Sequence, residues 1–318
     1  MGETVQKRIG ELDFLKCVFI LLMIVFHLVY IGDKYAYAKD LVYTFHIPAF
    51  LLISGYLMHV EKSTAAFLRS MFWIFVPYVV MESGYVVMSS VLPVRERVDN
   101  LTWQLWLDKV VSSPMGPYWY LHTLLVCGLA YFVVSRVMKG IAGVYPMLVA
   151  LSLVYVGLSY GMGFVAPSSA FYFMVGVAVK ELGVDFLSFF RSSWWSLLPF
   201  VLLAAFPANF DRFTLPGVCI TYLAISIVLA VYRLLPGFLR KIGCYIGSHT
   251  LILLVFSPIF TISVKPLVQV FAFDSTGMLF LIVSLLITVI GSFAITWVMD
   301  KLQVSRCFFG TNNALHPY

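Results

Sequence analysis

Apolar stretches of about twenty residues, each long enough to cross a bilayer as a helix, recur along almost the whole chain. We predict ten helices from these stretches and from the polar breaks between them. Their ranges are 12–32, 41–60, 67–92, 118–137, 142–160, 168–182, 194–209, 216–235, 248–272 and 277–300. The sequence therefore predicts a single all-α domain over residues 1–318, a polytopic membrane helix bundle of about ten transmembrane helices.

Composition supports a membrane protein and narrows the classes of function. Hydrophobic residues make up 61% of the chain and charged residues only 11%, whereas a soluble domain carries about 25% charged residues. So few charges cannot coat a water-facing surface, and membrane lipid is the expected surrounding. The net charge is +6, but no basic patch is interleaved with aromatic residues, so we expect no nucleic-acid partner. The five cysteines lack CxxC spacing, and we expect no metal site.

The distribution of lysine and arginine between alternate loops predicts the orientation of the chain. If the N-terminus is cytoplasmic, thirteen of the 21 basic residues fall in inside segments and seven in outside segments. Cytoplasmic loops carry the excess of these residues in membrane proteins. Both termini are therefore predicted to be cytoplasmic. The longest outside segment, from Pro93 to Pro117, contains Trp103 and Trp106 and is predicted to lie as an amphipathic segment on the outer interface.

Ionisable side chains within the predicted helices cost roughly 2.5–3.5 kcal/mol each and so mark candidate functional positions. Lys16 and His27 are eleven residues apart, which is about three turns, or ~16 Å, along one helical face. His46, Glu82 and His122 fall at a depth similar to that of His27 in the helices over 41–60, 67–92 and 118–137. The first four predicted helices thus bring a cluster of ionisable groups to the outer half of the bilayer.

Several of these candidates also have a structural interpretation. A membrane histidine such as His122 can be a hydrogen-bond partner between helices, and Glu82 can pair with an arginine or a histidine. Trp119 and Tyr120, at the start of the helix over 118–137, can be interfacial anchors. Both interpretations stay open at this point.

The predicted helix over 41–60 has backbone features that suit a site. Pro48 leaves one carbonyl without its helical partner and predicts a kink beside His46. Ser54 and Gly55 follow one to two turns deeper, where small residues let a neighbouring helix or a ligand approach the backbone. His249, in contrast, falls at the end of a predicted helix and is expected to be solvated.

Four motifs of the chain resemble the acyltransferase 3 family of bacterial membrane acyltransferases. They are Glu11–Lys16 (ELDFLK) followed after ten residues by His27, Phe45–Tyr56 (FHIPAFLLISGY), Gly116–Leu121 (GPYWYL) and, more weakly, Phe171–Gly176 (FYFMVG). The resemblance extends over essentially the whole chain. The first two motifs, in this order and at this separation, are fairly specific.

The resemblance implies a ten-helix domain in the bacterial inner membrane. It implies transfer of an acyl group, commonly acetyl, from cytoplasmic acyl-CoA to a hydroxyl of an envelope glycan or lipid-linked sugar. His27 matches the catalytic histidine of the family, and Lys16 matches a basic position that is often arginine. One departure is Ser257, which stands where a late family motif often has histidine. This departure puts the role of a late histidine in doubt.

The chemistry of acyl transfer gives each candidate a predicted role. An alcohol that attacks a thioester needs a base, and a neutral imidazole near pH 7 suits that task. We predict His27 as the general base, His46 as a group that orients the acceptor, stabilises the oxyanion or shares the proton, and Glu82 as a partner that fixes a histidine tautomer. Lys16, Arg8 and Arg69 are predicted to hold the phosphates of acetyl-CoA or another acyl-CoA, and Ser54, Trp119, Tyr120 and His122 to contact the acceptor.

Two other classes of function remain possible from the sequence. A multi-pass transporter or flippase also uses intramembrane histidine, glutamate and lysine as a proton or substrate relay, although no inverted repeat is evident. A structural membrane scaffold has no need of clustered ionisable groups. The sequence determines neither the acceptor, the acyl chain nor the oligomeric state.

Overall fold

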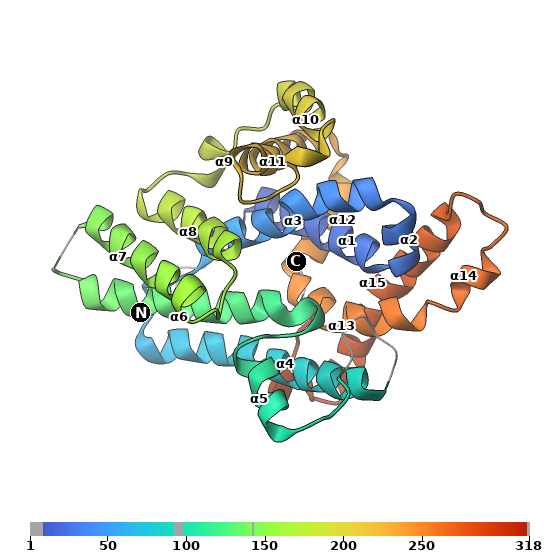
Figure 1. Cartoon of the computed structure of the whole chain (residues 1–318), viewed down its shortest axis with the longest axis horizontal. Helices are drawn as coiled ribbons and strands as arrows, with labels where there is room; N and C mark the ends of the chain where they lie inside the picture. The colour runs from blue at the N-terminus through green and yellow to red at the C-terminus, as the bar shows by residue number, and fades with distance from the viewer. Residues whose placement is uncertain (1–8, 92–97, 142, 317–318) are drawn as a thin grey trace.

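The computed structural model describes residues 9–91, 98–141 and 143–316, and this part of the chain is helical without a β-strand (Figure 1). The helices are α1 (Gly10–His27), α2 (Val29–Lys34), α3 (Ala36–Leu57), α4 (Thr64–Val91), α5 (Trp103–Val111), α6 (Trp119–Met138), α7 (Val144–Val156), α8 (Pro167–Glu181), α9 (Phe186–Phe189), α10 (Leu197–Ala204), α11 (Leu215–Leu234), α12 (Gly237–Ser248), α13 (Thr250–Ser263), α14 (Leu267–Val270), α15 (Met278–Lys301) and α16 (Ser305–Phe308). The all-α prediction is confirmed.

The number of membrane spans differs from the predicted ten. In the described part of the chain, six helical segments are long and apolar enough to cross a bilayer, or seven if α12 and α13, bent by 79°, form one broken span. The predicted helix over 12–32 breaks at Leu28, whose backbone leaves the helical region. The predicted helix over 194–209 is observed as a shorter apolar helix, Trp194–Ala204, whose α-helical part is the eight residues of α10. A count of ten spans is therefore not confirmed.

The bend between α12 and α13 overturns the expectation for His249. This residue joins the two helices, and only 3% of its surface is exposed. Its Nδ1–H donates to the carbonyl of Tyr245 at 2.7 Å, and its ring centroid lies 4.7 Å from that of His316. The prediction of a solvated His249 is wrong, because the helix continues past it in a new direction and encloses it.

Helix α15 shows how the surface of the molecule is adapted to lipid. Ser284, Thr288, Ser292 and Thr296 recur every four residues and are all fully buried, whereas Ile290 on the other face is 63% exposed. The hydroxyls of Thr288, Ser292 and Thr296 each donate to the backbone carbonyl four residues earlier, at 2.7, 2.7 and 3.0 Å, so these three groups are satisfied within the helix. This pattern, polar inside and apolar outside, is the reverse of that in a soluble protein and suits a helix with lipid on one side.

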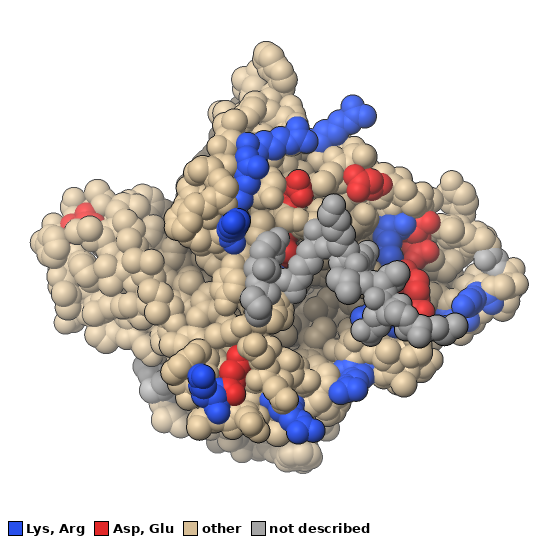
Figure 2. All heavy atoms as spheres, turned by 180° about the vertical axis from the view of Figure 1, so that it is seen from behind, with Lys and Arg blue, Asp and Glu red and all other residues tan. Residues whose placement is uncertain are grey.

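Charged side chains gather on the face of the molecule that points away from the viewer in Figure 1 (Figure 2). Lysine, arginine, aspartate and glutamate side chains surround a central hollow in this view, while uncharged side chains cover most of the lobe on the left. Large apolar side chains are exposed on several peripheral helices, such as Leu153 of α7 at 67% and Leu286 of α15 at 54%. A surface of this kind is stable against hydrocarbon and not against water.

The core is built around α1, which contacts α3, α11, α12, α13 and α15. Gly243 and Gly247 of α12, one turn apart, face α1. A Cβ atom on Gly247 would collide with the backbone of Asp13, and one on Gly243 would lie 2.7 Å from the ring of Phe14. A pair of glycines at this spacing lets two helices approach until their backbones touch. The tightly packed α1 then provides a rigid base for the residues along it.

Helices α3 and α8 also pack backbone to backbone. A Cβ atom on Gly55 would collide with the carbonyl of Phe173, and one on Gly176 would collide with that of Leu52. Two of the motifs in the sequence, Phe45–Tyr56 and Phe171–Gly176, therefore meet at this crossing. Gly55, one of the two small residues expected to permit a close approach in the predicted helix over 41–60, allows α8 to pack against the backbone of α3.

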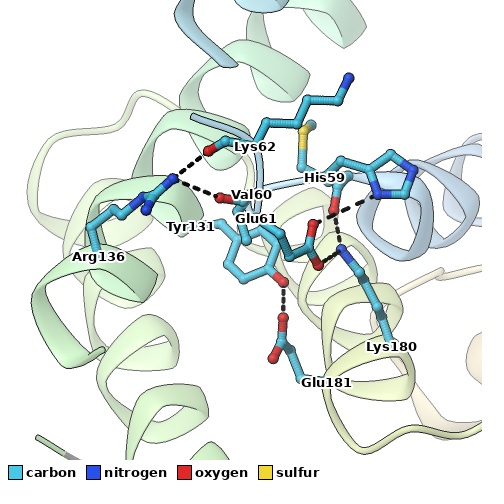
Figure 3. Close-up of polar contacts among 9 residues, drawn as sticks. His59, Val60, Glu61, Lys62, Tyr131, Arg136, Lys180 and Glu181 are labelled. Atoms are coloured by element: carbon cyan, nitrogen blue, oxygen red, sulfur yellow. Dashed lines mark hydrogen bonds and ion pairs between the residues drawn. The ribbon is translucent and has the colours of Figure 1, made fainter. Parts of the chain in front are cut away.

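Polar contacts fasten the segment between α3 and α4 to α6 and α8 (Figure 3). Lys180 of α8 donates to the carbonyl of Met58 and forms an ion pair with Glu61, both at 2.6 Å. His59 Nδ1 lies 3.7 Å from the other carboxylate oxygen of Glu61. Arg136 of α6 donates to the carbonyl of Lys62. These contacts hold the end of α3 in place.

Candidate active site

A cavity of about 210 Å³ lies between α1, α3, α6 and α13. It brings together residues that are distant in the sequence. Six of the predicted site residues line it: Lys16, His27, His46, Ser54, Trp119 and Tyr120. Most of the other lining side chains are apolar, among them Ile20, Phe50 and Leu254. We call the part lined by His27 and His46 the histidine end, and the part lined by Lys16 the lysine end.

The two histidines hold the same tautomer. Nδ1 of His27 lies 2.7 Å from the carbonyl oxygen of Met23, and Nδ1 of His46 lies 2.7 Å from that of Val42. A carbonyl oxygen only accepts, so each Nδ1 carries the proton in the neutral ring. Nε2 then carries the lone pair. Nε2 of His46 is buried and has no hydrogen-bond partner in the described part of the chain. Both imidazoles can therefore accept a proton or a hydrogen bond.

Tyr43 lies close to both histidines. Its ring centroid is 5.1 Å from that of His46 and 6.3 Å from that of His27. The Tyr43 hydroxyl donates to the carbonyl of Phe26 at 3.3 Å, next to His27 in the sequence. Tyr43 thus couples the position of α3 to the last turn of α1. The sequence analysis missed this residue, which has no charge and lies in an aromatic-rich helix.

Local breaks in the helices aim the histidines. His27 is the last residue of α1, and the chain turns at Leu28 into α2. In α3, Pro48 cannot donate to the carbonyl of Thr44. The hydroxyl of Thr221 in α11 lies 3.3 Å from that carbonyl and shares its hydrogen between it and the carbonyl of Gly217 at 3.0 Å. The freed carbonyl predicted from Pro48 is therefore satisfied by a neighbouring helix. This contact fixes the turn of α3 that bears His46.

Ser54 and Tyr120 connect α3 to α6 across the cavity. The Ser54 hydroxyl donates to the carbonyl of Phe50 at 2.8 Å, so the Tyr120 hydroxyl donates to Ser54 Oγ at 2.6 Å. Tyr120 is thus more than an interfacial anchor, because its hydroxyl is engaged inside the protein. Trp119, the residue before it, begins α6 and also lines the cavity.

Lys16 at the lysine end has an acidic partner. Its Nζ lies 2.6 Å from a carboxylate oxygen of Asp13, one turn earlier in α1. Asp13 is only 6% exposed, and the backbone of Gly247 packs against its own. The pair keeps a lysine at the edge of an apolar cavity without an unpaired charge. An anionic ligand at this end would share Lys16 with Asp13.

Glu82 and His122 do not line the cavity. Glu82 Oε1 accepts from the backbone N–H of Met115 at 2.5 Å, and His122 Nε2 donates to the carbonyl of Val111 at 2.8 Å. Both contacts hold the segment that connects α5 to α6. The histidine tautomers are set by backbone carbonyls, so the position of Glu82 gives no support to its predicted role. For His122, the contact agrees with the structural interpretation.

The predicted CoA-binding arginines are not part of the cavity wall. Arg69 lies exposed on α4, and Arg8 lies outside the described residues. Ser257, at the departure from the family motif, is buried in α13 and does not line the cavity, whereas Thr250, Leu251 and Leu254 of the same region do. Ser257 is therefore not part of the cavity wall.

A metal site is not evident among the described residues, where no group of three or more histidine, cysteine, aspartate or glutamate side chains is placed to hold an ion.

Helix α5 lies within the segment from Pro93 to Pro117 that was predicted to be amphipathic. It begins at Trp103, and the side chain of the preceding Thr102 accepts a hydrogen bond from the N–H of Leu105. Tyr78 of α4 donates to the carbonyl of Val110 at 2.6 Å and holds α5 against α4.

Comparison with known proteins places the chain in a family. A family model described as an acyltransferase domain matches residues 9–297, which covers every residue that lines the cavity. No curated protein and no solved structure shows a significant match to the chain. The matched region contains the four motifs, five of the six apolar spans and all but the last four residues of the sixth. It also contains His27 and His46, whose Nδ1 atoms are bound to backbone carbonyls. The chain belongs to the acyltransferase 3 family and is a multi-pass membrane acyltransferase.

Proposed function

We propose that the protein transfers an acyl group, most simply acetyl, from acyl-CoA to a hydroxyl of an envelope glycan or lipid-linked sugar in the bacterial inner membrane. The observation that carries this proposal is the pair of imidazoles whose Nε2 atoms are left to accept at one end of a cavity, with Lys16 at the other. The mostly apolar wall between them suits a thin chain such as pantetheine and its thioester.

His27 acts as the general base. Its Nε2 takes the proton from the acceptor hydroxyl while the hydroxyl oxygen attacks the thioester carbonyl. The carbon–sulfur bond breaks, the acyl group leaves with the acceptor as an ester, and CoA leaves as a thiolate that recovers the proton. Nδ1 stays hydrogen-bonded to Met23 O throughout and holds the ring in the productive tautomer.

His46 orients the acceptor. With its proton on Nδ1, the neutral ring presents an acceptor nitrogen at Nε2 and has no hydrogen to offer an oxyanion there. Of its predicted roles, orientation of a substrate hydroxyl or sharing of its proton fits this tautomer better than stabilisation of an oxyanion. Ser54, Trp119 and Tyr120 contribute the wall against which the donor and acceptor meet.

Lys16 binds the donor at the lysine end. A CoA phosphate there would receive a charge-assisted hydrogen bond from Nζ, which Asp13 holds in place. If the N-terminus is cytoplasmic, as the charge distribution predicts, this end faces the source of acyl-CoA. The acceptor then arrives at the histidine end, in the outer half of the bilayer.

The test is a donor assay with purified protein in nanodiscs. Wild-type protein is given radiolabelled acetyl-CoA with a membrane glycan extract, and His27→Ala and His59→Ala are run beside it. We expect labelled ester from wild type and His59→Ala and none from His27→Ala. A wild-type protein that neither binds nor consumes acetyl-CoA, but moves a sugar or proton across liposomes, would establish the transporter alternative instead.

A further inference from the structure

Lys39 lies over the ring of Tyr43, which is close to both His27 and His46. It belongs to the first turns of α3, and its Nζ is 5.8 Å from the centroid of the Tyr43 ring. The aliphatic part of its side chain packs near the backbone of Gly32, where a Cβ atom would be 3.3 Å from Cδ of Lys39. The Lys39 side chain therefore runs past Gly32 and places its ammonium over the aromatic ring that is close to both His27 and His46.

Arg212 reaches the same region from a different part of the chain. It follows Phe210 in the segment between α10 and α11, and the carbonyl of Phe210 accepts from the Thr44 hydroxyl at 2.9 Å. The carbonyl of Arg212 itself accepts from the Tyr172 hydroxyl at 2.6 Å. These two bonds fasten the segment to α3 and to α8, and Thr44 in α3 is half a turn from His46. Arg212 is therefore part of a built structure and not of a loose loop.

Neither cation has a carboxylate partner in the part of the chain that the structure describes. Among these described residues, no carboxylate forms an ion pair with Lys39 or Arg212. The neighbouring Asp211 directs Oδ1 to the backbone N–H of Phe213 at 2.9 Å. Tyr43, under the Lys39 ammonium, has its ring centroid 6.3 Å from that of His27 and 5.1 Å from that of His46. The segment that bears Arg212 is bound to Thr44, two residues before His46.

We propose that Lys39 and Arg212 bind an anionic group of the acceptor, a phosphate or a sugar carboxylate, and so place its hydroxyl at Nε2 of the two histidines. The proposal rests on the acyltransferase function above and names its acceptor as an anion. Both side chains are only partly exposed, and a counter-ion bound to a partly buried charge is worth more than one bound in open water. The arginine supplies a planar fork for two oxygens and the lysine a point charge.

The experiment uses full-length protein in nanodiscs of phosphatidylcholine, which carries no net charge. Radiolabelled acetyl-CoA and a membrane glycan extract are added, and the labelled esters are separated on an anion exchanger into neutral and anionic fractions. Mild acid then releases the sugar from a phosphate-linked carrier. If the labelled sugar no longer binds the anion exchanger after the acid treatment, the anionic group of the acceptor was the phosphate. If it still binds, the anionic group is a sugar carboxylate.

Three variants make the assay specific. Lys39→Gln and Arg212→Gln should each raise the KM for the anionic extract about tenfold, with the loss in KM and not in kcat, because a charge-assisted hydrogen bond is removed. Lys34→Gln is the matched control. Its Nζ also lies over a tyrosine, 5.6 Å from the Tyr30 centroid, but Tyr30 packs against Phe280 of α15, and KM should not change. In wild type, KM should rise with salt, and this dependence should weaken in the double variant.

Each other outcome overturns the proposal. Labelled ester mainly in the neutral fraction would show that the acceptor is not an anion. An effect of Arg212→Gln confined to nanodiscs with anionic phosphatidylglycerol, with a neutral product, would assign the cations to lipid headgroups. An equal effect of Lys34→Gln would show a general surface effect. No labelled ester and no acetyl-CoA consumption by wild type would refute the acyltransferase function itself, a result distinct from the other three.

Discussion

His27 and His46 expose the same ring nitrogen to one cavity, because each donates its Nδ1–H to the backbone carbonyl four residues before it. The two residues come from different helices, and no side chain is needed to set either tautomer. The equivalence ends at the backbone. His27 is the last residue of α1, where the helix breaks, whereas His46 lies inside α3, two residues before Pro48.

This relationship predicts different effects for the two histidines. His27→Gln should abolish both ester formation and acetyl-CoA hydrolysis, a loss of about 10²–10⁴-fold, since a general base is removed. His46→Gln should instead raise the KM for the acceptor more than it lowers kcat. Steady-state kinetics with varied acceptor check this division. Equal losses of kcat in both variants would mean that both rings move the proton.

Lys16→Met should weaken binding of the donor. Removal of one charge-assisted hydrogen bond to a phosphate costs roughly 1.5–3 kcal/mol, so the Kd for acetyl-CoA should rise at least about tenfold. Isothermal titration in nanodiscs measures the Kd, and Lys241→Met, on an exposed face of α12, serves as the control. An unchanged affinity in Lys16→Met would remove Lys16 from the donor site.

Glu82→Gln should separate a structural role from a catalytic one. The amide oxygen can still accept from the N–H of Met115, so activity should stay within about threefold of wild type, while Glu82→Ala should lower stability by ~1–3 kcal/mol because the buried N–H loses its partner. Activity and the thermal unfolding midpoint are measured together. A Glu82→Gln protein that is stable but inactive would restore the predicted catalytic role.

The crossing of α3 and α8 should be intolerant of any side chain. Gly55→Ala and Gly176→Ala each place a methyl group into a backbone carbonyl and should destabilise the protein by roughly 1–3 kcal/mol. Gly84→Ala is the control, because Gly84 lies within α4 with no atom within 4 Å of its Cβ position. That change should be neutral or stabilising by up to about 1 kcal/mol. Thermal unfolding in detergent compares the three variants.

The pKa of His59, in the segment after α3, should respond to its two charged neighbours, Lys180 and Glu61. Burial, and then the charge of Lys180, lowers the pKa of His59 below 6.5, whereas Glu61 raises it. Glu61→Gln should therefore lower the pKa of His59 further, and Lys180→Met should raise it. NMR titration of labelled histidine, assigned with His59→Gln, follows the shift. A pKa that moves in the opposite direction in either variant would contradict the ion-pair arrangement in Figure 3.

The same shift has a consequence for stability. Because the pKa of His59 is lower in the folded state, the unfolded chain takes up the proton first as the pH falls below 6.5. The contribution of His59 to stability is therefore complete above pH 6.5 and is lost as the pH falls from there through the folded pKa. His59→Gln should flatten the acid side of a plot of unfolding midpoint against pH.

The sequence by itself determined the class of fold and much of the site. Apolar runs require helices in a membrane because no other structure satisfies the backbone within a short segment. The helical repeat then placed Lys16 and His27 on one face, and six predicted residues do line one cavity. The family motifs were visible in the chain because each is local, contained within one or two turns of a helix.

Only the tertiary structure decided which residues meet and how the charges are compensated. The packing of α3 against α8 at Gly55 and Gly176, and the contact of Phe210 with Thr44 near His46, join segments far apart in sequence. The depth of Glu82 in its helix was readable, but the direction of its side chain was not, because rotation about the helix axis depends on packing against neighbours. The partner of each polar group is therefore a property of the assembled bundle and not of any single helix.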